Sequence, residues 1–190
     1  PVSFVDIAGI VRGASEGEGL GNKFLATIRE ADAIVQVVRG FSDPDVIHVD
    51  GGVNPASDME TINTELILAD LQTVEKAIPR LEKEIKGKKQ DPAVLAAAIE
   101  ARDVLNAGTP LSLSKVDMEP IRELGLMTAK PFLYVFNVDE GILGDAAKLE
   151  ELAKLVAPAK AIFLDAKLES ELIELDDEDA CQLRRTLRAD

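Results

Sequence analysis

The chain has 190 residues, enough for one sizeable domain with an insertion or for two small ones, and 46% of them are hydrophobic, which supports a buried core. Its formal net charge of -14 opposes non-specific attraction to DNA or anionic lipid, and no apolar run approaches the ~18 residues of a membrane span. The lone Cys181 cannot form an internal disulfide, so we expect a reducing, cytoplasmic setting. With one cysteine and one histidine, a zinc site is also excluded.

The opening segment joins an apolar run to an acid and a glycine-rich loop. Val2, Phe4 and Val5 predict a buried strand, and Asp6 would then follow that strand at the sheet edge where α/β proteins bind ligands. Asp6 can hold a water of a Mg²⁺ ion, and Gly9 can bring its backbone N–H close to a phosphate. The pattern predicts a sensor for a nucleotide γ-phosphate, with an ordinary strand-to-helix turn as the alternative.

Further elements alternate along the chain: a helical pattern at about 20–30 and strand-like runs at 33–38, 132–136 and 161–164. Near-continuous apolar strands separated by helices predict an α/β fold with a mostly parallel sheet. Asp6, Asn137 and Asp165 each directly follow a strand. We therefore expect these three side chains at one edge of the sheet.

The region from about 58 to 109 has a different periodicity. Its apolar residues recur at alternating spacings of four and three, as in helices that pack along one another: Ile67, Leu71, Val74, Ile78, Leu81 and Ile85, and on the return Val94, Ala98, Ala101 and Leu105. The returning helix begins at Pro92, after a turn at 87–91. We predict an antiparallel coiled-coil hairpin inserted into the sheet domain, kinked at Pro79.

The tip of the predicted hairpin is basic in an otherwise acidic chain, with Lys83, Lys86, Lys88 and Lys89 close together. Exposed turns commonly carry lysine, so a solvated tip explains the cluster adequately. The alternative is a contact to RNA, which would weaken as salt rises.

Four motifs in order give the chain a specific resemblance: Asp6-Ile-Ala-Gly-Ile-Val-Arg-Gly-Ala14, Gly17-Glu-Gly-Leu-Gly-Asn-Lys-Phe-Leu25, Ile62-Asn-Thr-Glu-Leu-Ile-Leu-Ala-Asp-Leu71 and Asn137-Val-Asp-Glu140. From about Val2 to Leu175 the sequence resembles the YchF family, the Obg-like ATPases. The resemblance implies a GTPase-like (P-loop) fold with a coiled-coil insertion, Mg²⁺-dependent hydrolysis of ATP in preference to GTP, and association with ribosomal RNA or protein. The family also has a carboxyl-terminal TGS domain, which is not visible by Asp190.

Domain bounds follow from the motifs: residues 1–57 and 128–190 would form a partial nucleotide-binding domain, and 58–127 the helical insertion. The resemblance implies a set of nucleotide contacts: Asp6, Ala8, Gly9, Asn137, Val138, Glu140, Asp165, Ala166 and Lys167. GTPases carry Asn-Lys-x-Asp, whose aspartate accepts hydrogen bonds from guanine N1–H and the exocyclic amine. Because Val138 and Glu140 replace two of these positions, strict guanine specificity is disfavoured. A strand-to-loop turn with a helix cap is the alternative interpretation of this motif.

The second base-pocket motif departs from the family pattern. Asp165-Ala166-Lys167 stands where the family usually has Ser-Ala-Lys. Backbone N–H contacts to a base can survive this change, and the carboxylate can accept a hydrogen bond from an adenine amino group. The departure leaves the base preference open.

Catalysis needs a group that positions the attacking water. Ile10 occupies the place where Ras-like proteins carry a glutamine, and an isoleucine cannot do this. The resemblance implies His48, in the loop after the second strand, as the family's alternative. A histidine of the surface or of loop packing is the other interpretation of His48.

No Gly-x-x-x-x-Gly-Lys-Ser/Thr phosphate loop occurs in the chain. Since that loop supplies most of the binding energy for a triphosphate, we expect the chain alone to bind nucleotide weakly or not at all. The chain opens at Pro1 without a methionine, and we expect a fragment whose parent supplies the loop upstream. Besides the ATPase, two functions stay open: a non-catalytic interaction module on a degenerate nucleotide-binding fold, and an Obg-type GTPase.

Overall fold

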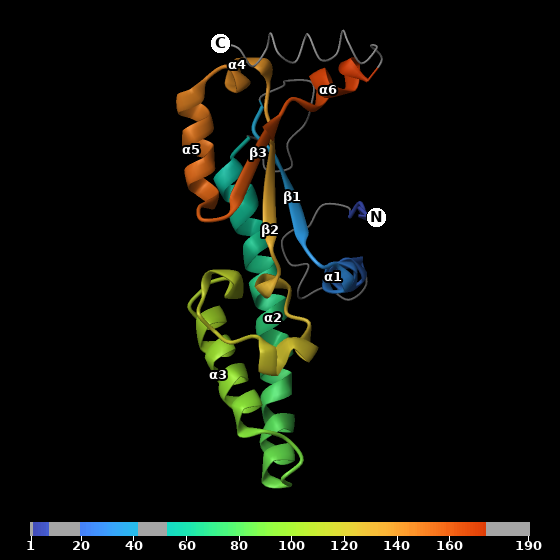
Figure 1. Ribbon diagram of the computed structural model, residues 1–190, viewed down its shortest axis with the longest axis vertical. Helices are drawn as coiled ribbons and strands as arrows, with labels where there is room; N and C mark the ends of the chain where they lie inside the picture. The colour runs from blue at the N-terminus through green and yellow to red at the C-terminus, as the bar shows by residue number, and fades with distance from the viewer. Residues whose placement is uncertain (1, 8–19, 42–52, 174–190) are drawn as a thin grey trace. The chain divides into compact units, whose positions relative to one another are not determined.

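The computed structural model describes residues 2–7, 20–41 and 53–173 (Figure 1). The chain forms two compact units. The first, which we call the hairpin unit, contains Pro1–Ile34 and Met59–Pro131. The second, the sheet unit, contains Val35–Asp58 and Phe132–Asp190.

Among its described residues, the hairpin unit contains three α-helices: α1 (Leu20–Glu30), most of α2 (Pro55–Lys86) and α3 (Pro92–Asn106). α3 begins where its sequence predicts, because Asp91 caps it by accepting a hydrogen bond from the Ala93 N–H at 2.8 Å. Most of the predicted seam is buried or partly buried in the hairpin core, with Val74, Ala98 and Ala101 fully inaccessible to solvent. The antiparallel helical hairpin is thus confirmed, and α2 runs through Pro79 without ending.

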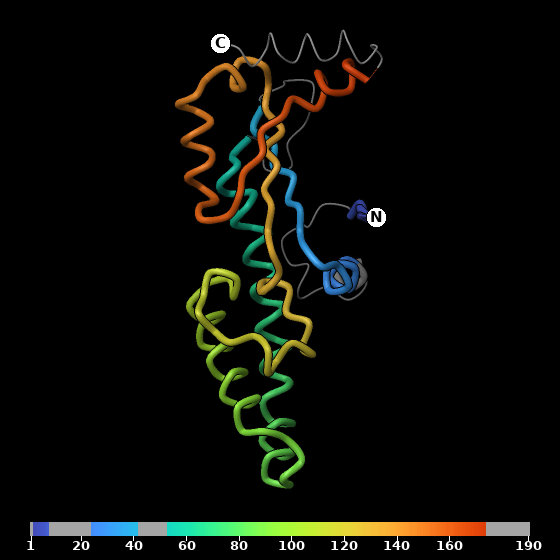
Figure 2. Tube along the Cα trace, viewed as in Figure 1, coloured from blue at the N-terminus to red at the C-terminus, as the bar shows by residue number. Residues whose placement is uncertain are grey.

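Three short 3-10 helices follow α3: η1 (Leu111–Leu113), η2 (Glu119–Leu124) and η3 (Met127–Ala129). The chain crosses here from α3 to α2 (yellow in Figure 2). Its apolar side chains complete the core of the hairpin: Leu111, Val116, Ile121 and Leu126. Beyond its place in the helical insertion predicted for 58–127, no individual element was predicted in this stretch.

In the described part of the sheet unit, three strands form a sheet in the order β1 (Ile34–Arg39), β2 (Phe132–Asn137) and β3 (Lys160–Leu164). β2 and β3 are parallel, with Asn137 opposite Leu164. The Ile34 N–H donates to the Pro131 carbonyl, and the Gly40 N–H donates to the Asn137 carbonyl. Because the residue numbers increase in the same direction on both strands, β1 and β2 are also parallel. The predicted parallel sheet with helices is confirmed, although the sheet is small.

Helices α4 (Glu140–Leu143), α5 (Ala146–Val156) and α6 (Ala166–Leu172) accompany the strands, and α5 packs beside β3 (Figure 1). One face of the sheet is buried, as Phe136 shows at 0% exposure with its ring stacked on Phe163. The other face leaves Val37 at 69% and Ile162 at 46% exposure. The sheet therefore has a covered face and an open face within the described residues.

The predicted first strand is wrong. Residues 2–7 adopt no regular structure, and Val2, Phe4 and Val5 are 84%, 82% and 65% exposed. Apolar alternation makes a strand only where a neighbouring strand pairs with it, and none of the described strands pairs with this segment. Asp6 therefore follows an exposed segment without regular structure rather than a buried strand.

Candidate functional site

The two motifs predicted to surround a nucleotide base meet in the sheet unit. Asn137 ends β2, and Ala166 begins α6 one residue after Asp165, which follows β3. Because β2 and β3 are parallel neighbours, their carboxyl ends lie at the same edge. There the Asn137 side-chain Oδ1 accepts a hydrogen bond from the Ala166 backbone N–H at 3.0 Å. A single side chain thus links the two motifs.

Backbone bonds hold the first motif from both sides. The Asn137 carbonyl accepts from Gly40 N–H at 2.7 Å, and the Val138 N–H donates to the Leu164 carbonyl at 2.9 Å. Val138 is 1% exposed, and its Cγ1 lies 2.8 Å from the place where a Cβ on residue 40 would be. The side chain at the position of the GTPase lysine therefore packs into the sheet unit, where it supports the motif from behind.

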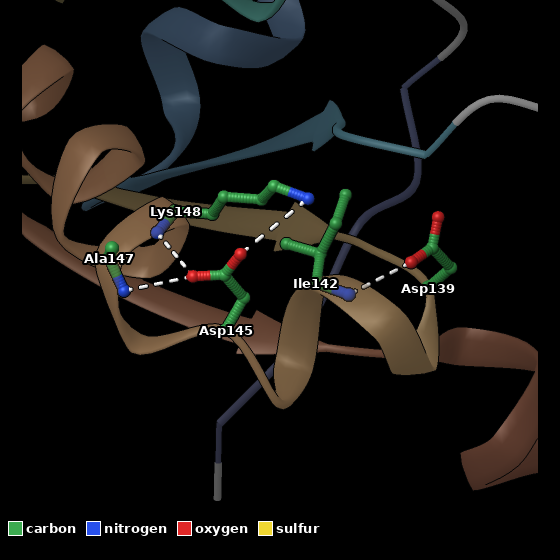
Figure 3. Close-up of polar contacts among 5 residues, drawn as sticks. All are labelled: Asp139, Ile142, Asp145, Ala147 and Lys148. Carbon is green, nitrogen blue, oxygen red and sulfur yellow. Dashed lines mark hydrogen bonds and ion pairs between the residues drawn. The ribbon is translucent and has the colours of Figure 1, made fainter.

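The acid inside the first motif is a helix cap. The Asp139 side chain accepts a hydrogen bond from the Ile142 N–H at 2.9 Å at the start of α4 (Figure 3). Glu140, the first residue of that helix, is exposed and forms no ion pair among the described residues. The capping interpretation thus accounts for Asp139 and leaves the Glu140 carboxylate available to a ligand.

A second aspartate, Asp145, caps the next helix, α5, and accepts two backbone hydrogen bonds where Asp139 accepts one. The Asp145 carboxylate accepts hydrogen bonds from the Ala147 and Lys148 N–H groups at 3.1 Å each, and the Lys148 ammonium lies 3.6 Å away (Figure 3). The backbone hydrogen bond from Lys148 and the charge of that residue hold the pKa of Asp145 below its usual value. This cap starts α5 and is separate from the motif at Asn137.

The second motif keeps its local structure despite its departure from the family pattern. Asp165 Oδ1 accepts hydrogen bonds from the Lys167 and Leu168 N–H groups at 3.0 Å each, which caps α6. Serine is an equally good N-cap, so aspartate replaces it without loss of the turn. Ala166 and Lys167 are exposed at the start of the helix.

The remaining predicted site residues divide into two groups. Ala8, Gly9, Ile10 and His48 lie outside the described residues, so their assigned roles stay predictions. Asp6 is exposed and belongs to the hairpin unit, whereas Asn137 and Asp165 belong to the sheet unit. Its position beside them therefore also stays a prediction. Within the described ranges, no group of three histidine, cysteine or acidic residues is arranged to hold a metal ion.

Sequence reasoning missed one residue with an unusual environment. Asp70 is 0% exposed in α2, and its carboxylate accepts hydrogen bonds from the backbone N–H groups of Met127 and Thr128. The signal was present in the spacing, because Asp70 lies three residues after Ile67 and four before Val74, on the apolar face of the helix. An acid on such a face indicates a buried acceptor with a specific partner.

The fold and its linked motifs define the class. A parallel sheet with helices, in which Asn137 ends one strand and Asp165 directly follows its neighbour, is the arrangement of a P-loop GTPase-like domain. A family model described as "50S ribosome-binding GTPase" matches residues 1–98.

Relatives make the assignment more specific. The chain is 45% identical to the ribosome-binding ATPase YchF of Bacillus subtilis, covering 93% of this chain and 50% of that protein. It is 43% identical to the YchF of Escherichia coli O157:H7, covering 98% and 53%. The structure of the Schizosaccharomyces pombe YchF GTPase matches with a TM-score of 0.74 and 31% identity, over 90% of this chain and 50% of that one.

The chain belongs to the YchF family of ribosome-binding GTPase-like proteins, which confirms the resemblance found in its motifs. It spans about half the length of the relatives that it matches. No helix in the described part of the chain combines the length and apolar character needed to cross a membrane.

Proposed function

We propose that the chain carries the base-recognising part of a nucleotide-binding domain, and that the full-length protein hydrolyses ATP to ADP and phosphate in preference to GTP. The observation that carries the proposal is the 3.0 Å hydrogen bond from Ala166 N–H to Asn137 Oδ1. It joins two sequence-distant motifs at the carboxyl edge of a parallel sheet, which is where this class of fold binds its ligand.

Base recognition would follow from the groups that this bond leaves available. With Oδ1 engaged, the Asn137 Nδ2 amide can donate to N7, an acceptor that adenine and guanine share. The exposed Glu140 carboxylate can accept from the adenine amino group. The pocket lacks the aspartate of Asn-Lys-x-Asp, which accepts hydrogen bonds from guanine N1–H and the exocyclic amine. The preference for guanine is therefore lost, and ATP can bind. Lys167 and the backbone of Ala166 would border the base from α6.

Phosphate and metal would be handled by the glycine-rich segment. Mg²⁺ is commonly bound by one or two carboxylates together with waters and substrate phosphates, and the exposed Asp6 carboxylate fits such a partial site. When bound, Mg²⁺ would neutralise charge on the transferred phosphate. Asp6 would hold a metal-bound water, Ala8 and Gly9 would approach the phosphate through their backbone, and His48 would position the attacking water.

The ribosome is the proposed partner, because the bacterial relatives carry the name ribosome-binding ATPase. The four lysines of the hairpin tip are all exposed and would contact ribosomal RNA: Lys83, Lys86, Lys88 and Lys89. Such a contact would weaken with added salt. A cytoplasmic location accompanies this role.

Nucleotide preference tests the proposal directly. In the full-length protein, calorimetric titration should show tighter binding of ATP than of GTP. The Glu140→Asp variant should shift that ratio toward GTP by about tenfold, because it restores the guanine acceptor. Glu151→Asp, at an exposed position of α5, is the matched control and should leave the ratio unchanged. Failure of the full-length protein to bind either nucleotide would refute the proposal.

GTP hydrolysis is a second candidate function. It is favoured by the description of the matching family model and by the name of the fission yeast protein, both of which specify a GTPase. The same titration separates the two, since this alternative requires GTP to bind more tightly than ATP.

A further inference from the structure

Three segments of the hairpin unit meet at one turn of α2, which we call the junction. The first contact is the buried Asp70 carboxylate. Its Oδ1 accepts from Met127 N–H at 2.9 Å, and its Oδ2 accepts from Thr128 N–H at 2.7 Å. Both oxygens of one carboxylate thus fix two consecutive backbone groups of η3 against α2.

The second contact starts two residues further along the same segment. The Lys130 ammonium donates to the Arg29 carbonyl at 2.9 Å and also to the Ala31 carbonyl. The Arg29 carbonyl lies in the last turn of α1 and the Ala31 carbonyl one residue past its end. The last turn of a helix leaves acceptors unsatisfied and carries partial negative charge. A lysine placed there holds the helix end by both hydrogen bonding and charge.

The third contact closes the triangle. The Arg29 guanidinium donates to the Thr73 hydroxyl at 2.8 Å, and that hydroxyl donates to the Ala69 carbonyl at 2.9 Å. Asp70 and Thr73 are three residues apart on α2 and share one face. α1, α2 and the segment at 127–130 are therefore tied pairwise at a single helical turn.

The junction holds a helix, α1, that directly follows the glycine-rich segment in the chain. α1 begins at Leu20, directly after the glycine-rich segment that starts at Asp6. Its amino end is thus continuous with the predicted γ-phosphate sensor, while its carboxyl end is fixed to the helix that forms the hairpin. A helix tied at one end transmits a displacement of its other end as a rigid element.

We propose that Lys130 is a positioning residue for the nucleotide-responsive segment: by holding the carboxyl end of α1 against the Asp70 turn of α2, it makes α1 and the helical hairpin move as one body. The inference rests on the proposed function, because the segment before α1 must respond to a nucleotide. The junction serves two purposes. It fixes the carboxyl end of the helix that follows the sensor, and it transmits a displacement of the sensor to the lysine-rich tip of the hairpin.

Spin labels on the full-length protein test the junction. Ala26→Cys on α1 and Gln90→Cys at the hairpin tip are exposed positions in the same unit, and other cysteines would be replaced. We expect one narrow distance distribution without nucleotide, with ADP and with a non-hydrolysable ATP analogue. Lys130→Met removes both donated hydrogen bonds while keeping the aliphatic stem, and it should broaden the distribution. Lys130→Arg should restore it, since a guanidinium can also donate to two carbonyls.

Kinetics separate positioning from a purely structural role. Lys130→Met should lower kcat for ATP by about tenfold with little change in KM. The reason is that the γ-phosphate sensor loses its fixed attachment through α1, while the pocket for the nucleotide base is intact. Thr73→Val, which breaks the third contact without charge change, should act in the same direction more weakly. Lys115→Met, an exposed lysine of the same unit, is the matched control and should have no effect.

The distance and kinetic measurements can each overturn the proposed role of Lys130. An unchanged distance distribution in Lys130→Met would overturn the proposal, as would a wild-type distance that shifts between ADP and the ATP analogue. A broadened distribution with unchanged kcat would show that Lys130 is only structural. The distance measurement without nucleotide remains valid if the wild type hydrolyses no ATP, so failure of the proposed function is distinguished from failure of the junction.

Discussion

The hairpin unit and the sheet unit differ in how completely they bury their apolar side chains. In the hairpin, Val74, Ala98 and Ala101 are fully buried by residues on the neighbouring helix and on the segment that follows it. In the sheet, one face is packed while Val37 and Ile162 on the other are 69% and 46% exposed. A helical hairpin finds its packing partners nearby in sequence, whereas a parallel sheet needs distant segments on both faces.

The covered face of the sheet should show the largest effect. Phe136→Ala removes a fully buried ring stacked on Phe163 and should cost about 3–5 kcal/mol of unfolding free energy. Val37→Ala, on the open face of the same sheet, should cost well under about 1 kcal/mol. Urea denaturation of both variants measures the difference. Equal losses would mean that the open face is covered in solution.

The junction of the hairpin unit should come next. Asp70→Ala leaves two buried N–H groups, those of Met127 and Thr128, without an acceptor, and it should destabilise the hairpin unit by about 2–3 kcal/mol. Glu123→Ala, at an exposed position in η2, is the control and should change stability by less than about 0.5 kcal/mol. Amide hydrogen exchange at Met127 and Thr128 localises the loss. Unchanged protection there would contradict the assigned role of Asp70.

A smaller effect is expected at the cap of the second base-pocket motif. Asp165→Ala should cost about 1 kcal/mol, because the Lys167 and Leu168 N–H groups lose their acceptor. Asp165→Ser should cost only a few tenths of that amount, since serine also caps helices. Thermal denaturation of the two variants checks this. A serine variant as unstable as the alanine variant would show that Asp165 acts otherwise than as a cap.

The smallest effect is a pH dependence of opposite sign in the two units. Burial raises the pKa of Asp70 above 3.8, against the opposing hydrogen bonds from Thr128 and Met127. Its protonation therefore favours the folded state, a contribution present below pH 3.8 and lost as the pH rises through the folded-state pKa. The backbone bond from Lys148 lowers the pKa of Asp145, whose contribution is present above pH 3.8 and lost as the pH falls through its folded-state value.

Unfolding free energies of the wild type, Asp70→Asn and Asp145→Asn measured from neutral to acidic pH test these signs. On acidification the stability of the wild type relative to Asp70→Asn should rise, and its stability relative to Asp145→Asn should fall. Changes of the same sign in both comparisons would contradict the account of the two carboxylates.

The sequence predicted those elements whose packing is local. The spacing of apolar residues located α2 and α3, and Pro92, after the turn at 87–91, located the start of α3. The apolar runs of β1, β2 and β3 were equally informative, because strands of parallel sheets have near-continuous apolar sequences. Residues 2–5 have the same composition but no strand beside them, so composition alone misled.

The candidate site was predictable in part for a related reason. Asn137 and Asp165 could be placed together because both lie at the carboxyl ends of neighbouring strands in one parallel sheet. The bond between Asn137 and Ala166 depends on the register of β2 against β3, which no local pattern encodes. The 3-10 helix η3 was missed because it is held by Asp70, which lies more than fifty residues earlier in the chain.

The central claim is that Asn137, joined to Ala166, forms a pocket for the base of a nucleotide. The most direct test compares ATP with inorganic tripolyphosphate, which lacks the base, as ligands of the full-length protein. Asn137→Ala should weaken the binding of ATP by at least about tenfold and leave the binding of tripolyphosphate unchanged. An unchanged affinity for ATP, or an equal loss for both ligands, would contradict the claim.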